Sequence, residues 1–374
     1  MTRYYDRSRT VTDWSCARKR YWNYEFDGKG IVPNTTALEL FLGTTVHDGL
    51  AAVAHGVAID DIAGTAWKET FDGLIELDMT SSEDEAMAFA KEQASLVEGL
   101  LRGFNRHVWP QLMAEYPTIV AVEKEMTYKH NGLTFMSKPD LVLEGPDGTV
   151  VYVEYKTTSS KKDSWINSWN TAVQLHSTMR AIKETMNVDV TGVIVQGLYK
   201  GYESYGKQSS PFCYAYRRAA NPPFVKEEIG YEYKAGFRRF PIWELPGGVQ
   251  KWVETMPIEI LRDQFPRTPL IFINDELVER FFAQRATREM EIAMAMEMVK
   301  DTDDEEAKTQ ILDVSFPQKF DQCIPSFGRP CIYRNLCFNR VTSPLSQGYT
   351  YREPHHAPEL EAQSEQHVGT ESSD

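Results

Sequence analysis

The sequence predicts an α/β protein in which a mixed central sheet is flanked by helices and preceded by a helical insertion. Two observations carry this prediction. Apolar residues follow helical spacing over residues 31–117, and strand spacing takes over at residues 118–200, where one helix interrupts it. A chain that passes between strands and a helix in this order is typical of a layered α/β core.

The composition is that of a globular chain, with 42% hydrophobic and 25% charged residues. These values exclude a mainly disordered or collagen-like protein. No apolar run approaches the roughly 18 residues of a membrane span. No apolar stretch of a secretory signal follows the first residues, so we expect a soluble, cytoplasmic protein without membrane contact. The net charge of −14 excludes a protein that coats nucleic acid with its whole surface, but it does not exclude a nuclease with metal-binding carboxylates.

The helical region at residues 31–117 precedes the core. Its apolar spacing predicts three helices, over residues 35–54, 59–77 and 82–111. Pro110 and Pro117 are expected to end this region.

The core at residues 118–200 contains the predicted sheet. Strands are expected over residues 118–128, 133–143 and 150–156, followed by a helix at 165–186 and a buried strand at 188–199. Four further segments are expected: a basic, aromatic N-terminal segment at 1–30, decorating strands and a long helix at 201–300, a cysteine segment at 301–340, and a disordered acidic tail at 341–374.

Acidic residues and a lysine converge on the second and third predicted strands. Strand alternation in VVYVEYK places Glu154 and Lys156 on one face, and a hairpin with the preceding strand brings Asp140 beside them. Two carboxylates that hold Mg²⁺ or Mn²⁺, with a lysine near the phosphate, suit phosphodiester hydrolysis. The alternative is a surface hairpin with an ordinary Glu–Lys face.

These residues resemble the PD-(D/E)XK nuclease superfamily, whose first motif stands here as Pro139-Asp140 and whose second stands as Glu154-Tyr155-Lys156. Gly43-Thr44-Thr45-Val46-His47 resembles the G-x-x-x-H element of the RecB-type exonuclease branch, which implies that His47 is a further metal ligand. The resemblance thus implies a Mg²⁺ or Mn²⁺ site formed by His47, Asp140 and Glu154.

The same branch has a Q-x-x-x-Y motif on the next helix. Gln174 matches its glutamine, whereas Thr178 replaces its tyrosine. The implied catalytic set is therefore Asp140, Glu154, Lys156 and Gln174. Glu123 on the first predicted strand is a further candidate carboxylate, although Glu125 points to the same side of a regular strand.

Three of the five cysteines lie in the short segment CIPSFGRPCIYRNLC, and with no secretion signal metal ligation is a better expectation than disulfides. Cys16 lies in CARKRYWNYEF, which resembles the C-P-R-x-x-Y opening of iron–sulfur nucleases of the AddB and CRISPR-adaptation types. The resemblance implies a four-iron, four-sulfur cluster that joins the two ends of the chain, bound by Cys16, Cys323, Cys331 and Cys337. Four thiolates also suit zinc, which stays the alternative. Cys213 is expected to be a buried free thiol.

Two basic segments beside tryptophans are candidates for nucleic-acid contact through phosphate pairing and base stacking. The first comprises Arg18, Lys19 and Arg20 near Trp22, and the second comprises Lys161 and Lys162 near Trp165. The alternative is that these are solvated charges and packed aromatic rings.

The resemblance implies a metal-dependent exonuclease that hydrolyses single-stranded DNA or DNA ends in repair, recombination, or phage- or CRISPR-related metabolism. The cell would be a bacterium or a phage-infected host. The resemblance also implies a helicase or recombination protein as a partner, and the sequence itself has no GxxxxGK[ST] motif. The alternative is a catalytically silent nucleic-acid-binding or scaffold protein that keeps the cysteine site.

Overall fold

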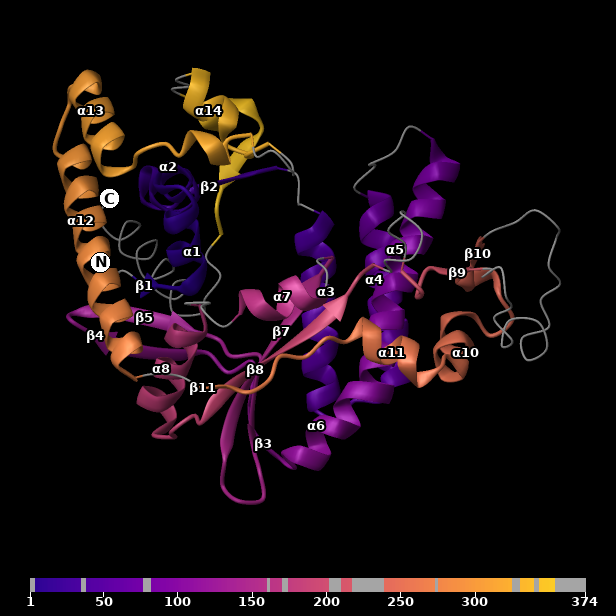
Figure 1. Cartoon of the computed structure of the whole chain (residues 1–374). Coiled ribbons are helices and arrows are strands. Elements are labelled where there is room, and N and C mark those ends of the chain that lie inside the picture. The colour runs from indigo at the N-terminus through magenta and orange to yellow at the C-terminus, as the bar shows by residue number, and fades with distance from the viewer. Residues whose placement is uncertain are drawn as a thin grey trace, which may run out of the picture.

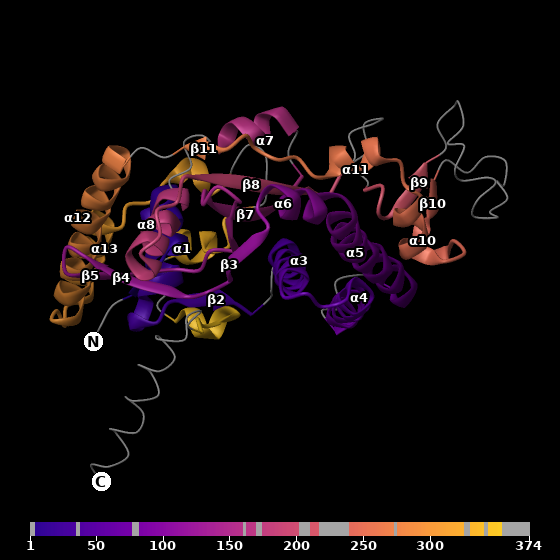
Figure 2. The same cartoon turned by 90° about the horizontal axis from the view of Figure 1, so that it is seen from below.

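A five-stranded mixed sheet with helices on both faces forms the centre of the molecule (Figures 1 and 2). The computed structural model describes residues 4–34, 38–76, 82–159, 162–169, 174–201, 210–216, 239–272, 275–324, 330–339 and 343–353. No helix within these ranges combines the length and the apolar character needed to cross a membrane.

The central sheet has the strand order β11-β8-β7-β6-β3. Strands β7 and β8 are parallel, and the remaining neighbours are antiparallel. This arrangement confirms the predicted mixed α/β core. The strands are β3 (Thr118–Val122), β6 (Leu141–Glu144), β7 (Val150–Thr158), β8 (Gly192–Tyr199) and β11 (Ile271–Phe272).

One face of this sheet is covered by α3 (Leu38–Ala54) and α5 (Glu83–Gly103), with α4 (Ile59–Glu76) packed on both helices. Apolar residues of α3 and α5 share a core with Val151 and Val153 of β7. These helices confirm the three predicted ones in place and nearly in length.

The sequence predicts that Pro110 helps to end the helical region, but the helical region continues past it. A π-helical turn at Phe104–Val108 continues α5, and Pro110 lies in the first turn of α6 (Trp109–Glu115). Proline is tolerated in the first turn of a helix, and the turn before it is closed by a π-type bond from the Trp109 amide to the carbonyl of Phe104.

The opposite face is covered by α7 (Lys162–Ser168), α8 (Gln174–Met186) and the long α12 (Asp275–Lys300). Their apolar residues bury Tyr152 of β7 and Val193 of β8 in a second core. The chain predicted as one helix over residues 165–186 is thus found as α7 and α8.

Two strands predicted as continuous are each divided in two. Residues 118–128 form β3 and β4 (Met126–His130), and residues 133–143 form β5 (Leu133–Ser137) and β6. In each case the two halves belong to different sheets. Strands β3 and β6 are in the central sheet, whereas β4 and β5 join β1 (Tyr4–Tyr5) in the order β1-β5-β4. Both breaks fall at the same level, where Pro139 has no N–H for a ladder bond and Glu123 has a positive φ of 43°.

The two ends of the described chain lie side by side, the indigo segment beside the yellow one in Figure 1. Strand β2 (Ile31–Pro33) pairs antiparallel with β12 (Tyr349–Tyr351). The sequence had predicted a disordered tail from residue 341, so β12 corrects that boundary, and residues 354–374 lie outside the described ranges. The other elements at this end are α1 (Arg7–Ser15), α2 (Ala17–Arg20), η1 (Tyr21–Glu25), η2 (Phe26–Gly28), α13 (Glu305–Ser315), η5 (Phe320–Gln322), α14 (Arg334–Asn339) and η6 (Pro344–Gln347).

The segment between β8 and α12 packs beside α5. It contains β9 (Tyr214–Tyr216), β10 (Arg239–Pro241), η4 (Ile242–Glu244), α10 (Gly248–Thr255) and α11 (Ile258–Gln264). Trp252 of α10 donates its indole N–H to the carbonyl of Pro211 at 2.7 Å. Cys213 is buried here as a free thiol, as the sequence predicted, and burial raises its pKa well above the ordinary value.

Candidate metal centre and cysteine cavity

The two strand breaks bring two carboxylates together. Glu123 follows β3 and Asp140 precedes β6, and the amide of Glu123 donates to the carbonyl of Asp140 at 3.1 Å. Lys138 Nζ lies 2.7 Å from Glu123 Oε2. Because the chain changes sheets at this point, both carboxylates project at the junction and not within a regular ladder.

Asp140 is held from two further elements. Its Oδ2 accepts a hydrogen bond from the amide of Tyr155 on β7 at 2.7 Å, and its Oδ1 lies 3.3 Å from His47 Nδ1 on α3. The predicted hairpin is present, because Leu141 pairs with Val153. Burial works to raise the pKa of Asp140, but His47, Lys156 and the Tyr155 amide outweigh it and lower that pKa. Asp140 is therefore an anion fixed in one orientation.

His47 reaches the junction because α3 passes close to β7. A Cβ at Gly43, one turn earlier on α3, would lie 3.7 Å from the Thr157 hydroxyl, so the helix and the strand are nearly in contact there. Burial works to lower the pKa of His47, but the charge and the hydrogen bond of Asp140 raise it above the ordinary value. The neighbouring carboxylate thus favours the protonated form of the His47 imidazole.

Ligand atoms of His47, Glu123 and Asp140 all lie within 4.8 Å of one another, and this is the metal-ligand group found among the described residues. The predicted set contained Glu154 in place of Glu123. The break in the strand explains why Glu123 and not Glu125 belongs to the group, since a regular strand would have pointed both the same way. Pro139 beside Asp140 was the sequence signal that the strand pair is interrupted there.

Glu154 and Lys156 form an ion pair on β7 beside this group. The Glu154 side chain is only 2% exposed, whereas that of Lys156 is 21% exposed. The alternation of β7 is as predicted, because Val153 and Tyr155 belong to the core on the α3 face and Tyr152 belongs to the opposite one. Lys156 therefore neutralises a buried carboxylate while part of its side chain stays exposed to solvent.

Gln174 is the first residue of α8, and its side chain lies outside the described part of the structure. Thr178, at the position of the motif tyrosine, is buried and its hydroxyl is 2.9 Å from that of Ser137. Ser137 ends β5 and precedes Lys138-Pro139-Asp140. The Thr178 hydroxyl is therefore used in a buried contact that joins α8 to the end of β5.

We expect Thr178→Val to lower the free energy of unfolding by about 1–2 kcal/mol, because it leaves the buried Ser137 hydroxyl without its partner. Urea unfolding followed by circular dichroism measures the change. Thr178→Ser keeps the hydroxyl and should recover most of the loss. Equal destabilisation in both variants would assign the effect to packing of the methyl group.

The first basic segment does not form the surface that the sequence predicted. Arg18 is buried and pairs with Asp313 at 2.5 Å, and Arg20 is only 1% exposed and pairs with Glu289 at 3.0 Å. Trp22 and Trp165 are buried as well, so neither ring is free for base stacking. In the second segment, Lys161 lies outside the described residues, as does the side chain of Lys162.

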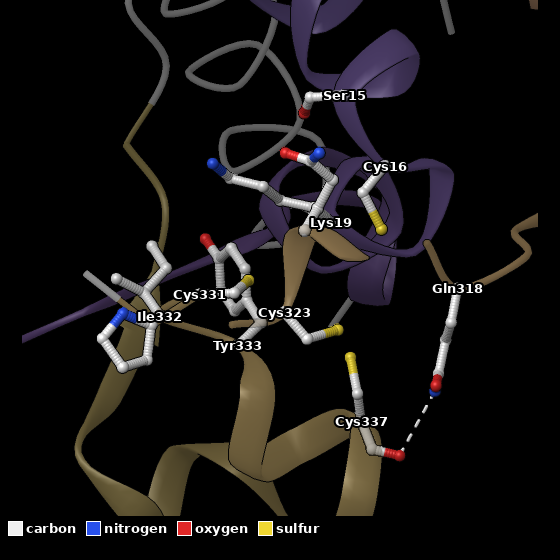
Figure 3. Close-up of a pocket in the computed structure, with 11 residues that line it drawn as sticks. Ser15, Cys16, Lys19, Gln318, Cys323, Cys331, Ile332, Tyr333 and Cys337 are labelled. Atoms are coloured by element: carbon white, nitrogen blue, oxygen red, sulfur yellow. Dashed lines mark hydrogen bonds between the residues drawn. The ribbon is translucent and has the colours of Figure 1, made fainter. Parts of the chain in front are cut away.

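A cavity of about 290 Å³ lies between the two ends of the chain, and Cys16, Cys323, Cys331 and Cys337 all line it. Figure 3 shows their side chains projecting into this space from the N-terminal and C-terminal segments, with Lys19 at one wall. Burial raises the pKa of Cys337 to about 11, and burial also raises the pKa of Cys323. These two thiols are therefore neutral in the metal-free chain, and a bound metal has to displace their protons.

The four sulfurs are a candidate donor set for a metal site. Among the described residues, which include all four cysteines, no three sulfur atoms lie within 4.8 Å of one another. A single zinc ion bound at about 2.3 Å by each thiolate would hold them about 3.8 Å apart. The four thiols line one cavity of about 290 Å³, and a donor set of four thiols suits either a zinc ion or an iron–sulfur cluster.

Comparison with known families identifies the superfamily of the chain. A sequence profile of the PD-(D/E)XK nuclease superfamily matches residues 9–337, a range that contains the metal-ligand group and all four cavity cysteines. A search of curated proteins found no match. The matched range covers most of the chain, and the mixed sheet with helices on both faces is consistent with the fold of that family. The chain belongs to the PD-(D/E)XK nuclease superfamily.

Proposed function

We propose that this nuclease-superfamily protein is a metal-dependent exonuclease of the RecB type that acts on single-stranded DNA. The observation that carries the proposal is the convergence of His47, Glu123 and Asp140 beside the Glu154–Lys156 pair. A catalytically silent module of the same fold would have no need of a fixed carboxylate anion, an imidazole and a lysine at one point.

His47, Glu123 and Asp140 are the residues that would hold Mg²⁺ or Mn²⁺, since carboxylate oxygens are the ligands these hard ions prefer. Such an ion lowers the pKa of water and neutralises charge on a phosphate. Glu154 is a further proposed ligand from β7. The Tyr155 amide keeps Asp140 oriented, so this carboxylate needs little rearrangement on binding.

Lys156 is the proposed electrostatic catalyst. Its ammonium group pairs with Glu154 and its side chain is 21% exposed, so we propose that it orients a water molecule or donates to an oxygen that gains negative charge during hydrolysis. Gln174 at the start of α8 stays the fourth member of the proposed catalytic set, and Lys161 and Lys162 stay proposed phosphate contacts.

We expect the wild-type protein, with Mn²⁺ or Mg²⁺, to degrade linear single-stranded DNA to short products and to leave a circle of the same sequence intact. An exonuclease needs a free end, which only the linear substrate offers. Gel analysis of both substrates, labelled internally, measures the difference. Cleavage of the circle would assign the chain as an endonuclease, and a folded protein that cuts neither DNA nor RNA would establish the silent alternative.

We further propose that Cys16, Cys323, Cys331 and Cys337 bind a four-iron, four-sulfur cluster. Four thiolates are the usual ligands of such a cluster, and all four cysteines line the same cavity of about 290 Å³. Hydrolysis needs no electron transfer, so the proposed role is structural. Zinc stays the alternative, and metal analysis of protein purified without oxygen separates the two.

The wider setting follows from the resemblance to RecB-type enzymes. We propose that the chain processes DNA ends in repair, recombination, or phage- or CRISPR-related metabolism. A helicase or recombination protein that opens duplex DNA is the proposed partner.

A further inference from the structure

Lys138 is a cation at the mouth of the proposed metal site that the catalytic set does not include. Its side chain is 44% exposed, and its Nζ lies 2.7 Å from Oε2 of Glu123. It stands two residues before Asp140, in the segment where β5 ends and β6 begins. The structure thus places an ammonium group directly on one of the three candidate ligands.

An ammonium group and a divalent ion compete for the same carboxylate. A ligand atom of Glu123 lies within 4.8 Å of those of His47 and Asp140. A divalent ion bound there would neutralise the Glu123 carboxylate and so weaken its attraction for Lys138. The Glu123–Lys138 pair is also partly solvated, and ion pairs of this kind hold weakly. Metal binding is therefore expected to release Lys138.

We propose that Lys138 exchanges partners during the reaction: it pairs with Glu123 in the metal-free protein and binds a backbone phosphate of the DNA strand once the metal is bound. The proposal rests on the metal-dependent nuclease function above. A lysine ammonium on a flexible stem suits this exchange, because it forms bonds to carboxylate and phosphate oxygens without a fixed geometry. Lys138 Nζ lies 2.7 Å from Glu123 and Lys138 is two residues from Asp140 in the sequence. A DNA strand bound at the metal site would therefore lie close enough for Lys138 to contact one of its phosphates.

The exchange makes two predictions of opposite sign for Lys138→Ala. Without DNA, Mn²⁺ should bind about threefold to tenfold more tightly than to the wild type, because a competing positive charge is gone. With Ca²⁺ supporting binding without cleavage, single-stranded DNA should bind more weakly. The plot of log K against log salt should also become less steep: the magnitude of its negative slope should decrease by about 0.7, the value for one phosphate contact on a single strand.

Electron paramagnetic resonance of free Mn²⁺ measures the first quantity, and fluorescence anisotropy of a labelled oligonucleotide at several salt concentrations measures the second. Lys183→Ala is the matched control. Lys183 is 50% exposed and pairs with Asp189 at 2.8 Å, near the start of β7 and away from Lys156, so this variant removes an equal charge and a similar ion pair. Lys138→Arg should restore the salt slope.

The two results together support the exchange, and the absence of either one overturns it. Weaker Mn²⁺ binding by Lys138→Ala would mean that Lys138 only orients Glu123. Unchanged DNA binding would mean that Lys138 meets no phosphate. If the wild type itself bound no Mn²⁺ and cut no DNA, the failure would lie in the proposed function, whereas a wild type that does both isolates the failure to Lys138.

Discussion

Asp140→Asn is expected to reduce cleavage of single-stranded DNA by about 10³-fold or more, equivalent to about 4 kcal/mol of transition-state stabilisation. Asp140 is the one candidate ligand in contact with both other elements of the site, through the His47 imidazole and the Tyr155 amide. Asparagine keeps the size and the acceptor for Tyr155 but removes the charge that a divalent ion needs. Initial rates with Mn²⁺ at saturating DNA measure the loss.

Glu144→Gln is the matched control, because Glu144 ends β6, the strand that directly follows Asp140, and is only partly buried near the hairpin turn. It should cleave at nearly the wild-type rate. Circular dichroism should show both variants folded. An Asp140→Asn variant that keeps more than about a tenth of the wild-type rate would remove this carboxylate from the proposed catalytic set.

Cys331→Ser is expected to bleach the brown colour of an iron–sulfur protein and to lower the melting temperature by roughly 10 °C or more, because metal-binding free energy contributes to folding free energy. A cluster between Cys16 and the C-terminal trio would close a loop of nearly the whole chain. Visible absorption, iron content and thermal unfolding under anaerobic conditions measure these effects.

Cys213→Ser is the control for this variant, since Cys213 is a buried thiol outside the cavity that donates to the carbonyl of Glu92. It should leave the colour and the iron content unchanged. A colourless wild type that contains zinc would contradict the cluster. A Cys331→Ser variant that loses iron but melts at the wild-type temperature would contradict the structural role.

Local pattern was enough to predict the central hairpin. Alternation in VVYVEYK and the turn before it depend on neighbouring residues only, and the structure has both where they were expected. The approach of His47 and of the four cysteines was implied by resemblance to known families, and the structure places His47 beside Asp140 and the cysteines around one cavity.

The features that the sequence did not predict depend on partners far along the chain. The break at Glu123 depends on the opposite strand, where Pro139 interrupts pairing. The local sequence around Arg18 and Arg20 does not show whether they face solvent or carboxylates. Only the fold shows that they pair with Asp313 and Glu289. Strand β12 pairs with β2, which lies near the other end of the sequence.

The pairing of β2 with β12 has a consequence for how the chain is made. Ile31 leaves the ribosome long before its partner Tyr351, and Tyr333 meets Asn23 across 310 residues of sequence. The segment around Ile31 therefore cannot complete these contacts until the segment around Tyr351 has emerged. Contacts of such long range slow folding and leave apolar surface exposed in the interval, so this chain is at greatest risk of aggregation while it is still being translated.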